Sequence, residues 1–362
     1  MTYDLTVIPG DGVGPSVIEA AQAVIAAADV DVRWAVHDVG PAAVDRGLEA
    51  IPESALATMR ATAAILKGPV TNGPRMPGAA SVNVALRRDL DLYVQVRPCR
   101  TRKGVVSPFN DVDLVVIRET TEDLYAGVEF EAGSEGARTV IDAWHRTGRG
   151  ELPADAGLSI KFTTAEASRR MLEFAFSYAR DHGRRMVTAV HKAGVMRCTD
   201  GIFLDQARGV ADRYPDLVYN ECQVDDLCGR LVRRPSEFDV MVMGIAYGDI
   251  VSDVAAALVG GIGVIPGANF GDRGAMFEPA HGTAASHAGR DRVDPTAAIL
   301  CAAMLLEHLG ETTAARRVES ALDRVIAVGD AVTYDLRSPE DRRPVVGTRA
   351  MTEQVIDAMG AM

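Results

Sequence analysis

The sequence predicts an α/β fold. Short apolar segments rich in β-branched residues, such as Leu5 to Ile8 and Val112 to Ile117, alternate along the chain with alanine-rich segments of helical periodicity. This alternation of strand and helix patterns is typical of α/β proteins. The length of 362 residues supports the same prediction, because it suffices for two domains or one large α/β unit.

The first elements are well marked. An apolar strand at Leu5 to Ile8 leads through a glycine-rich turn into an alanine-rich helix. The glycines of the turn, Gly10, Gly12 and Gly14, are spaced G-x-G-x-G and not G-x-G-x-x-G, so a plain strand-to-helix turn is at least as well supported as a dinucleotide-binding loop. The elements expected up to residue 66 are a helix at 16–28, an extended segment at 32–36, a helix at 52–60 and a strand at 63–66.

A glycine- and proline-rich loop at 70–80 precedes the next helix. Such a loop is expected to be exposed and mobile. Ser81, at its end, can cap a helix in which Asn83 and Arg87 share one face. The loop and this helix start therefore mark a place where a ligand could be met.

Two further arginines follow strand-like segments. Arg97 directly follows the segment 92–96, and Arg118 directly follows the segment 112–117. A single surface arginine is more often a solvated charge than a ligand-binding group. Three arginines at element ends, Arg87 included, can converge on the carboxylates of one anion.

The second half of the chain continues the alternation. Residues 131–155 are rich in glycine, charge and turn residues, which indicates an excursion outside the main sheet. Thr163 to Glu166 form a plausible capping box for a helix that Gly183 follows. The other elements expected are strands at 158–163, 186–190 and 240–243, a helix at 199–214, a loop at 274–288 and a helix opened by Asp294-Pro295 that runs to 309–310.

An acidic pair stands in the stretch Tyr247 to Asp253. Asp249 and Asp253 are four residues apart, so if 250–258 is helical both carboxylates project from one face. Two like charges on one face repel, and a divalent cation with oxygen ligands would offset that repulsion. The alternative is a solvated acidic first turn of the helix, which also interacts well with the helix dipole.

Charge and cysteine content exclude several classes of function. A net charge of −12 argues against a nucleic-acid partner, because phosphate binding needs a basic face. Five cysteines without a C-x-x-C pair argue against a disulfide framework or a zinc site. No apolar run reaches the roughly 18 to 20 residues of a membrane-spanning helix, and the N-terminus lacks the pattern of a signal peptide, so a cytoplasmic location without membrane partner is expected.

Ordered motifs along the chain resemble those of the isocitrate/isopropylmalate dehydrogenase family, and its isocitrate dehydrogenase branch most. They span nearly the whole length and are specific in their order. The motifs are Lys67-Gly68-Pro69, Ser81 to Arg87, Leu92 to Pro98, Arg118 to Gly127, His191-Lys192, Tyr247 to Asp253 and His281-Gly282-Thr283.

The resemblance implies a fold as well as an activity. It implies a large open mixed-sheet domain built from residues 1–95 and 258–362, and a smaller α/β domain from residues 96–257 that forms the dimer interface. The excursion at about 126–165 would join a dimer clasp.

The activity implied is a metal-dependent oxidative decarboxylation of a 3-substituted malate, with hydride transfer to NAD or NADP. By matching position, Asp225, Asp249 and Asp253 would hold Mg²⁺ or Mn²⁺. Lys192 resembles the family's base for the hydroxyl proton, and Tyr125 its proton donor to the enol. Asp225 and Lys192 would come from the partner subunit of a homodimer.

The substrate is expected to be a small anion, with isocitrate the first choice. Arg87, Arg97 and Arg118 would bind the malate carboxylates, while Ser81 and Asn83 would meet the third carboxylate. An alkyl substituent would leave those two polar groups unpaired, at a cost of roughly 1 to 3 kcal/mol each. The loop at 70–80 departs from the usual isocitrate pattern, so homoisocitrate, a phosphonate analogue of isocitrate, tartrate and isopropylmalate stay as alternatives.

The cofactor signals conflict. The residues that the resemblance assigns to the cofactor are His281, Gly282, Thr283, Ser286, His287, Asp294, Arg234 and Tyr334. The aspartate that NAD enzymes place after the His281 loop is missing, while Arg234 and Tyr334 match positions that bind the 2′-phosphate, so the sequence favours NADP over NAD. Asparagines usual in the family are replaced here by Gly194, Ile245 and Asp294.

A third hypothesis makes the chain a non-catalytic regulatory subunit of a heteromeric enzyme. The residues with predicted catalytic or metal-binding roles are all present, and this argues against that hypothesis.

Overall fold

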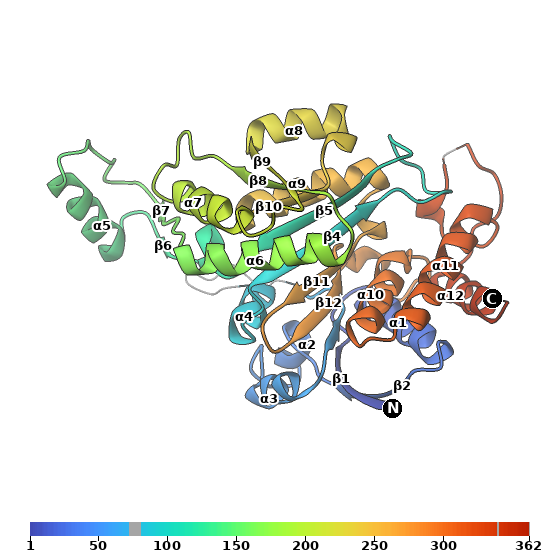
Figure 1. The fold of residues 1–362 in the computed structure, drawn as a ribbon. Helices are drawn as coiled ribbons and strands as arrows, with labels where there is room; N and C mark the ends of the chain where they lie inside the picture. The colour runs from blue at the N-terminus through green and yellow to red at the C-terminus, as the bar shows by residue number, and fades with distance from the viewer. Residues whose placement is uncertain (72–80, 339, 362) are drawn as a thin grey trace.

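The computed structural model describes residues 1–71, 81–338 and 340–361. Ten strands form one continuous mixed sheet, and two short strands, β6 and β7, pair separately (Figure 1). The strands are β1 Thr2–Ile8, β2 Asp31–Val36, β3 Ile65–Lys67, β4 Val94–Arg100, β5 Asp113–Glu119, β6 Glu129–Phe130, β7 Leu158–Ser159, β8 Met186–His191, β9 Val218–Gln223, β10 Val240–Met243, β11 Pro266–Phe270 and β12 Ala275–Pro279.

The ten-stranded sheet has the order β2-β1-β3-β12-β11-β4-β5-β10-β8-β9. Its two ends are parallel, and antiparallel pairing is confined to the middle, where β11 pairs with β12 and β4, and β4 with β5. The parallel strands in the interior of the sheet are largely buried because helices cover both faces. β10 Val240–Met243, for example, is buried at every position.

The described residues form twelve α-helices, most of which pack around the sheet. In Figure 1, α8 and α9 lie on one side of the β4-β5-β10-β8-β9 half and α6 and α7 on the other, while α1, α10, α11 and α12 pack together at the other end. The helices are α1 Gly14–Ala27, α2 Pro41–Val44, α3 Glu53–Ala61, α4 Val82–Asp89, α5 Glu135–Arg146, α6 Ala165–Asp181, α7 Asp200–Ala211, α8 Val224–Arg233, α9 Ile245–Val259, α10 Thr296–His308, α11 Thr312–Val328 and α12 Thr348–Gly360. Single 3₁₀ turns are η1 Asp123–Ala126, η2 Pro235–Glu237, η3 Ile262–Val264, η4 Ala285–His287 and η5 Tyr334–Leu336.

The predicted α/β class and the mixed sheet are confirmed, with shifts of a few residues at most element ends. The cap of α4 is Ser81, as predicted, and its hydroxyl accepts a hydrogen bond from the Val84 N–H. The capping box predicted at Thr163 is displaced by one residue, because Thr164 caps α6. Asp294 does not occupy the N-cap of α10, where Pro295 stands, although its carboxylate accepts the Thr296 N–H.

The excursion outside the main sheet is present but is more ordered than its composition indicated. It carries α5 Glu135–Arg146, a helix that was not predicted, and it projects from the body at the left of Figure 1. The strand expected at 158–163 is only Leu158–Ser159 and pairs with β6, so the chain does not rejoin the main sheet there. The loop expected at 274–288 begins as strand β12, paired to β11.

The domain boundaries predicted at 95 and 258 fall inside this architecture and stay a prediction. The first boundary lies within β4, which pairs with β11 from the later part of the chain. No helix among the described residues is both long and apolar enough to cross a membrane.

Candidate functional site

Three arginines converge on one face of the molecule from three elements. Arg87 lies in the last turn of α4, and Arg97 and Arg118 lie within β4 and β5. The prediction that each arginine stands at an element end is confirmed for Arg87 and for Arg118, the penultimate residue of β5, and is wrong for Arg97, which lies in the middle of β4. All three are buried, with 6%, 8% and 3% of their surfaces exposed. Buried guanidiniums need anionic partners.

Helix α9 presents Asp249 and Asp253 to these arginines. Arg118 forms an ion pair with Asp249, and Arg97 Nη1 lies 3.5 Å from Asp253 Oδ1. The Tyr125 hydroxyl donates to Asp249 Oδ2 at 2.7 Å. Because α9 begins at Ile245, both acids lie inside the helix beyond its first turn, and the solvated-first-turn alternative is wrong.

The charge states in this cluster follow from burial and pairing. Burial alone would raise the pKa of Asp249, but Arg118 and the Tyr125 hydroxyl outweigh it and lower that pKa. Burial and the bond to Asp249 raise the pKa of Tyr125 to about 12. The pair therefore combines an ionised carboxylate with a phenol that keeps its proton at neutral pH.

Gly248 makes the close approach of α9 possible. A Cβ atom at this position would lie 2.4 Å from Cβ of Arg118 and 2.9 Å from its Cδ. Only a residue without a side chain lets the helix backbone rest against the arginine. The close packing of α9 against Arg118 therefore explains why the Tyr247 to Asp253 motif contains a glycine.

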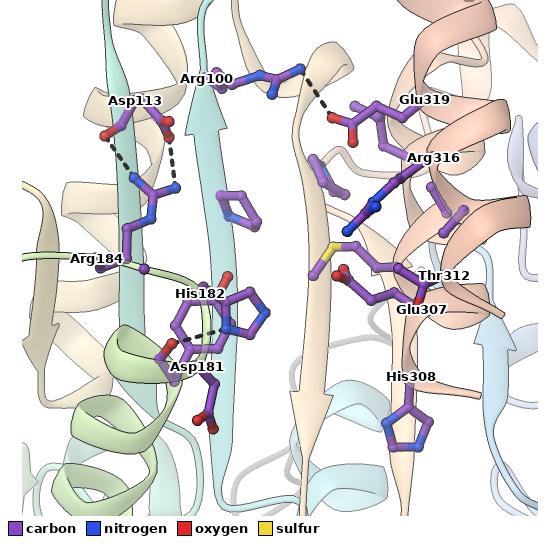
Figure 2. Close-up of a pocket in the computed structure, with 18 of the residues that line it drawn as sticks. Arg100, Asp113, Asp181, His182, Arg184, Glu307, His308, Thr312, Arg316 and Glu319 are labelled. Atoms are coloured by element: carbon purple, nitrogen blue, oxygen red, sulfur yellow. Dashed lines mark hydrogen bonds and ion pairs between the residues drawn. The ribbon is translucent and has the colours of Figure 1, made fainter. Parts of the chain in front are cut away.

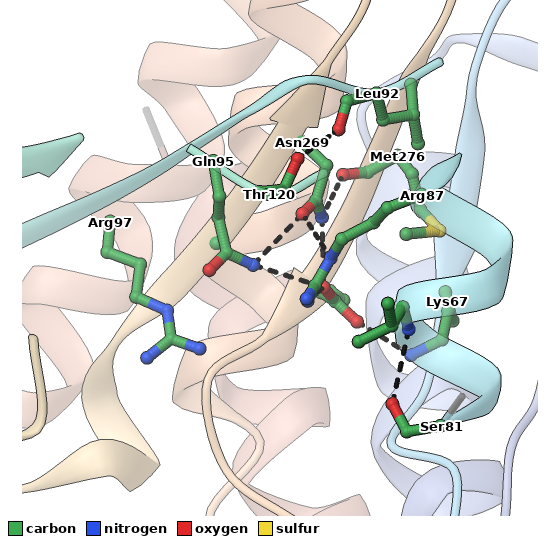
Figure 3. Close-up of polar contacts among 12 residues, drawn as sticks. Lys67, Ser81, Arg87, Leu92, Gln95, Arg97, Thr120, Asn269 and Met276 are labelled. Carbon is green, nitrogen blue, oxygen red and sulfur yellow. Dashed lines mark hydrogen bonds and ion pairs between the residues drawn. The ribbon is translucent and has the colours of Figure 1, made fainter. Parts of the chain in front are cut away.

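Behind the arginines lies a buried polar network that the sequence did not reveal (Figure 3). Glu278 accepts from Lys67 Nζ at 2.6 Å and from Arg87 Nη2 at 2.7 Å. Gln95 and Asn269 complete the network. Burial alone would raise the pKa of Glu278, but its two cationic partners hold that pKa well below its ordinary value. The one usable sequence signal was a polar residue, Gln95, inside an apolar strand.

Ser81 and Asn83 stand at the start of α4, on the Arg87 side of the cluster. The Ser81 hydroxyl is used as the helix cap. Among the described residues, the buried Oδ1 atom of Asn83 has no hydrogen-bond partner. The loop at 70–80, proposed from sequence as the place where a different anion would fit, lies outside the described residues from 72 onward.

Lys192 and Asp225 form a second, separate group. Lys192 Nζ lies 2.5 Å from Asp225 Oδ1, and this bond lowers the pKa of Asp225. No hydrogen bond or ion pair in the described part of the chain joins this pair to the α9 acids. Within 1–71, 81–338 and 340–361, no group of three or more His, Cys, Asp or Glu side chains is placed to hold a metal ion. Asp225 therefore does not join Asp249 and Asp253 in one such group within the described chain.

Asp200 holds the backbone at Lys192 in place. Its Oδ2 atom accepts the Lys192 backbone N–H at 2.6 Å and the Tyr247 hydroxyl at 3.1 Å. Sequence reasoning missed this residue, since nothing in the 199–214 helix pattern distinguished it from an ordinary first-turn acid.

The predicted cofactor residues form a loop region against the N-terminal turn. The Val13 N–H donates to the Thr283 carbonyl at 2.9 Å, and a Cβ at Gly12 would collide with that carbonyl. His287 stacks on Tyr334 with ring centroids 6.1 Å apart. Gly282 and Ser286 are exposed beside them. His281 Nε2 and His287 Nδ1 are buried and lack partners among the described residues, so the loop has unused polar atoms for a ligand.

Arg234 is not part of this loop region. It follows α8, and its Nε atom lies 2.9 Å from Glu237 Oε1. In the described chain no hydrogen bond or ion pair connects it to Tyr334. The guanidinium over the Tyr334 ring is instead that of Arg292, 4.1 Å from the ring centroid.

Asp294 is a buried acid, 5% exposed, and its ionisation is expected to destabilise the fold. Burial, with a contribution from Asp335, raises the pKa of Asp294 from 3.8 to about 7. Because the folded pKa is the higher one, the stabilising effect of the neutral acid is complete below pH ~4 and is lost as pH rises through ~7. At pH 8 the Asp294→Asn variant is expected to have a higher free energy of unfolding than wild type. At pH 5.5 this difference in free energy should be about 2 kcal/mol smaller. Urea unfolding at the two pH values measures it.

The exposed Asp45→Asn variant is the control for this experiment and should show no pH-dependent difference from wild type. An equal advantage of Asp294→Asn at both pH values would contradict the prediction.

A cavity of about 760 Å³ lies elsewhere and contains none of the predicted site residues (Figure 2). It lies between the α6 side of the sheet and helices α10 and α11. Most of its charges are already paired, as Arg184 is with Asp113 at 2.7 Å and Arg100 with Glu319 at 3.1 Å. Its lining therefore favours no particular ligand charge, and the arginine and aspartate cluster stays the candidate site.

The chain is similar to known proteins over most of its length. Residues 4–355 match the family model described as isocitrate/isopropylmalate dehydrogenase. The alpha subunit of human mitochondrial isocitrate dehydrogenase [NAD] is 41% identical over 333 residues, which cover 92% of this chain and 85% of that protein. The corresponding probable subunit of Caenorhabditis elegans is 42% identical over 332 residues, covering 92% and 87%.

A solved structure gives the same result for the fold. The crystal structure of isocitrate dehydrogenase from Methylococcus capsulatus superposes with a TM-score of 0.89 at 41% identity and covers 99% of both chains. At this identity the likeness extends from the fold to the sequence.

Proposed function

The chain belongs to the isocitrate/isopropylmalate dehydrogenase family, and from this premise we propose that it oxidises and decarboxylates isocitrate. Isocitrate and the oxidised cofactor would give 2-oxoglutarate, CO₂ and the reduced cofactor. The observation that carries the proposal is the pairing of two buried guanidiniums, Arg97 and Arg118, with the acid pair of α9, with the buried Arg87 close to Arg118. A guanidinium matches the planar geometry of a carboxylate, and the substrate has three of them.

The choice of isocitrate over an alkyl-substituted malate rests on the start of α4. Ser81, whose hydroxyl caps the helix, and Asn83 stand there. The Asn83 amide can donate its N–H groups to a carboxylate, whereas an alkyl group would leave this amide without a partner, at a cost of roughly 1 to 3 kcal/mol. A polar, anionic substituent is the better partner.

The α9 acids suit a divalent cation. Asp249 and Asp253 offer carboxylate oxygens, the ligands that Mg²⁺ and Mn²⁺ prefer, and their side chains are 40% and 64% exposed. We propose that Asp225 of a second chain supplies the third carboxylate. When bound, the ion polarises the substrate hydroxyl and the ketone that replaces it.

Two side chains would move protons in the reaction. The Tyr125 phenol keeps its proton at neutral pH, as its raised pKa requires, so it can donate that proton to the enol left after CO₂ departs. Lys192, brought from the second chain together with Asp225, would accept the proton of the substrate hydroxyl. Arg118 holds the Asp249 and Tyr125 pair in register with the substrate carboxylate.

For the cofactor we propose NAD, in place of the NADP that the sequence favoured. The curated relatives compared above are named for NAD, and the Arg234 guanidinium that would bind a 2′-phosphate is already paired with Glu237. Asp335, next to Tyr334, adds a negative charge that would oppose a 2′-phosphate. The unpartnered nitrogens of His281 and His287 are available to a dinucleotide.

A homodimer with shared sites is proposed because large apolar side chains are exposed near the second group. Val195 is 73% exposed next to Lys192, and Val232 and Ile250 are more than half exposed on α8 and α9. A second chain covering these side chains would bring Lys192 and Asp225 to the α9 acids. A cytoplasmic location, the prediction from the N-terminal sequence, completes the proposal and can be checked by cell fractionation.

A substrate panel tests the proposal. Purified protein with Mn²⁺ is offered isocitrate, homoisocitrate, isopropylmalate, tartrate or a phosphonate analogue, each with NAD or NADP, and reduced nicotinamide is followed by absorbance. The pair of isocitrate and NAD is expected to give a kcat/KM at least ~10-fold above every other pair. A higher value for another acid would replace the substrate, and no turnover by the folded dimer would support a regulatory subunit.

A further inference from the structure

Gln95 stands at the centre of the buried network behind the arginines (Figure 3). We propose that it is a positioning residue for Arg118 and thereby sets the affinity of the site for its anionic substrate. The inference rests on the proposed function in one respect only, the identity of isocitrate as that substrate.

The register of three antiparallel strands places Gln95 beside its partners. Gln95 of β4 lies directly opposite Arg118 of β5 on one side and Asn269 of β11 on the other. Directly opposed residues in an antiparallel pair have Cβ atoms about 4.5 to 5.5 Å apart, within reach of a side-chain hydrogen bond. Arg118, Gln95 and Asn269 thus form one row across the sheet.

Both the oxygen and the nitrogen of the Gln95 side-chain amide form hydrogen bonds within this row. Its Oε1 atom accepts from Arg118 Nε at 2.7 Å. Its Nε2 atom donates to Asn269 Oδ1 at 3.0 Å and to Glu278 Oε1 at 3.2 Å. A carboxylate could only accept and an ammonium could only donate, so the chemistry of the row requires an amide here.

The anchor on the far side is rigid. Asn269 Nδ2 donates to the Met276 carbonyl at 3.2 Å and to Glu278 at 2.9 Å, and Lys67 and Arg87 hold Glu278 from other directions. Gln95 itself is 1% exposed. These hydrogen bonds restrict the orientation of the Gln95 amide, and the amide in turn restricts the orientation of the Arg118 guanidinium.

The consequence for Arg118 is a fixed guanidinium. Its Nε–H is occupied by Gln95, and its Nη1 side faces Asp249. The nitrogens left for a substrate carboxylate therefore point in one direction. A preorganised fork loses little side-chain freedom on binding, and this is reflected in affinity more than in the chemical step.

Gln95→Met tests the inference, because methionine has a similar volume and lacks the amide. Its KM for isocitrate is expected to rise at least ~10-fold with kcat changed less than ~3-fold, the size expected for one hydrogen bond to a charged group. In an Arg118→Lys background the same substitution should add less than ~3-fold, since two residues that act through one interaction are not additive. An unchanged KM, or an equal effect in both backgrounds, would overturn the inference.

Two further measurements separate positioning from general stability. Val96→Ala, also on β4 but with its side chain on the other face, should lower the melting temperature and leave KM unchanged. The arginine Nε–H resonance of Arg118, assigned by its loss in Arg118→Lys, should exchange with solvent at least ~10-fold faster in Gln95→Met, and unchanged exchange would contradict the inference. Gln95→Asn, one methylene too short to span the row, replaces Gln95→Met in all measurements if the latter does not fold.

The resonance experiment needs no substrate. If wild-type protein does not turn over isocitrate, the proposed function fails, while the exchange of the Arg118 Nε–H still decides whether Gln95 positions this arginine.

Discussion

Lys192→Met is expected to lower kcat by roughly 10² to 10⁴, the range found for a lost general base. Methionine keeps most of the side-chain length and removes the amine that would accept the hydroxyl proton. Turnover with saturating isocitrate, Mn²⁺ and NAD measures the loss. Lys103→Met, at an exposed lysine in the turn after β4, is the matched control, and its kcat should stay within about twofold of the wild-type value.

Mixing two inactive variants tests where Lys192 acts. In one chain Lys192 pairs with Asp225 and does not meet Asp253. If the sites are shared, a dimer of one Lys192→Met chain and one Asp253→Asn chain has one site with both lesions and one intact site. Random exchange of subunits would then restore about a quarter of wild-type activity. No recovery, with exchange verified by mass spectrometry, would show that each site is built from a single chain.

Removal of divalent cations by a chelator is expected to abolish turnover, and added Mn²⁺ should restore it. The reason is that the acid pair of α9 and Asp225 would hold the ion that polarises the substrate hydroxyl. Asp253→Asn and Asp225→Asn are each expected to weaken Mn²⁺ binding at least ~10²-fold, because each removes a charged ligand. Calorimetric titration with Mn²⁺ measures this without turnover.

The neighbouring Asp226→Asn provides the control for the metal experiment. Asp226 is also a first-turn acid of α8, but it lies 3.4 Å from Arg230 and is not a predicted ligand. Its Mn²⁺ affinity should match wild type. Equal losses in Asp225→Asn and Asp226→Asn would indicate a general charge effect and would contradict the assignment of Asp225.

Local patterns predicted most of the regular elements because those elements are stabilised by local chemistry. The Ser81 cap and the alternation of strand and helix are readable within a few residues. Helix α5 was missed because its glycine-rich, charged surroundings hid its apolar face, of which Ala137 and Ile141 are buried. The hairpin of β11 and β12 was missed because its small residues and its buried polar residues, Asn269 and Glu278, do not form the apolar pattern that predicts a strand.

In the candidate site, too, some residues were predicted from the sequence and others were not. Arg97, Arg118, Tyr125 and the α9 acids were predicted from motifs, and the structure brings them together. Arg87, also predicted, is linked to Arg118 through Asn269 and Gln95. Arg234 was placed with the cofactor residues, and the chain keeps it apart from Tyr334. Asp200 and Gly248 were not singled out, because their importance lies in a backbone contact and a close approach that only coordinates reveal.

The sequence by itself determined the fold class, the family and the chemical types present at the site, because each depends on residue identity and spacing along the chain. The tertiary structure decided which of these groups meet. Arg87 and Glu278 are 191 residues apart in sequence and 2.7 Å apart in space, and no local pattern predicts such a contact. It also decided that the acid pair of α9 lies inside a helix against two arginines, and that Lys192 and Asp225 form a separate group within one chain. The physical reason is that strand register and helix packing, which set these distances, are properties of the whole core.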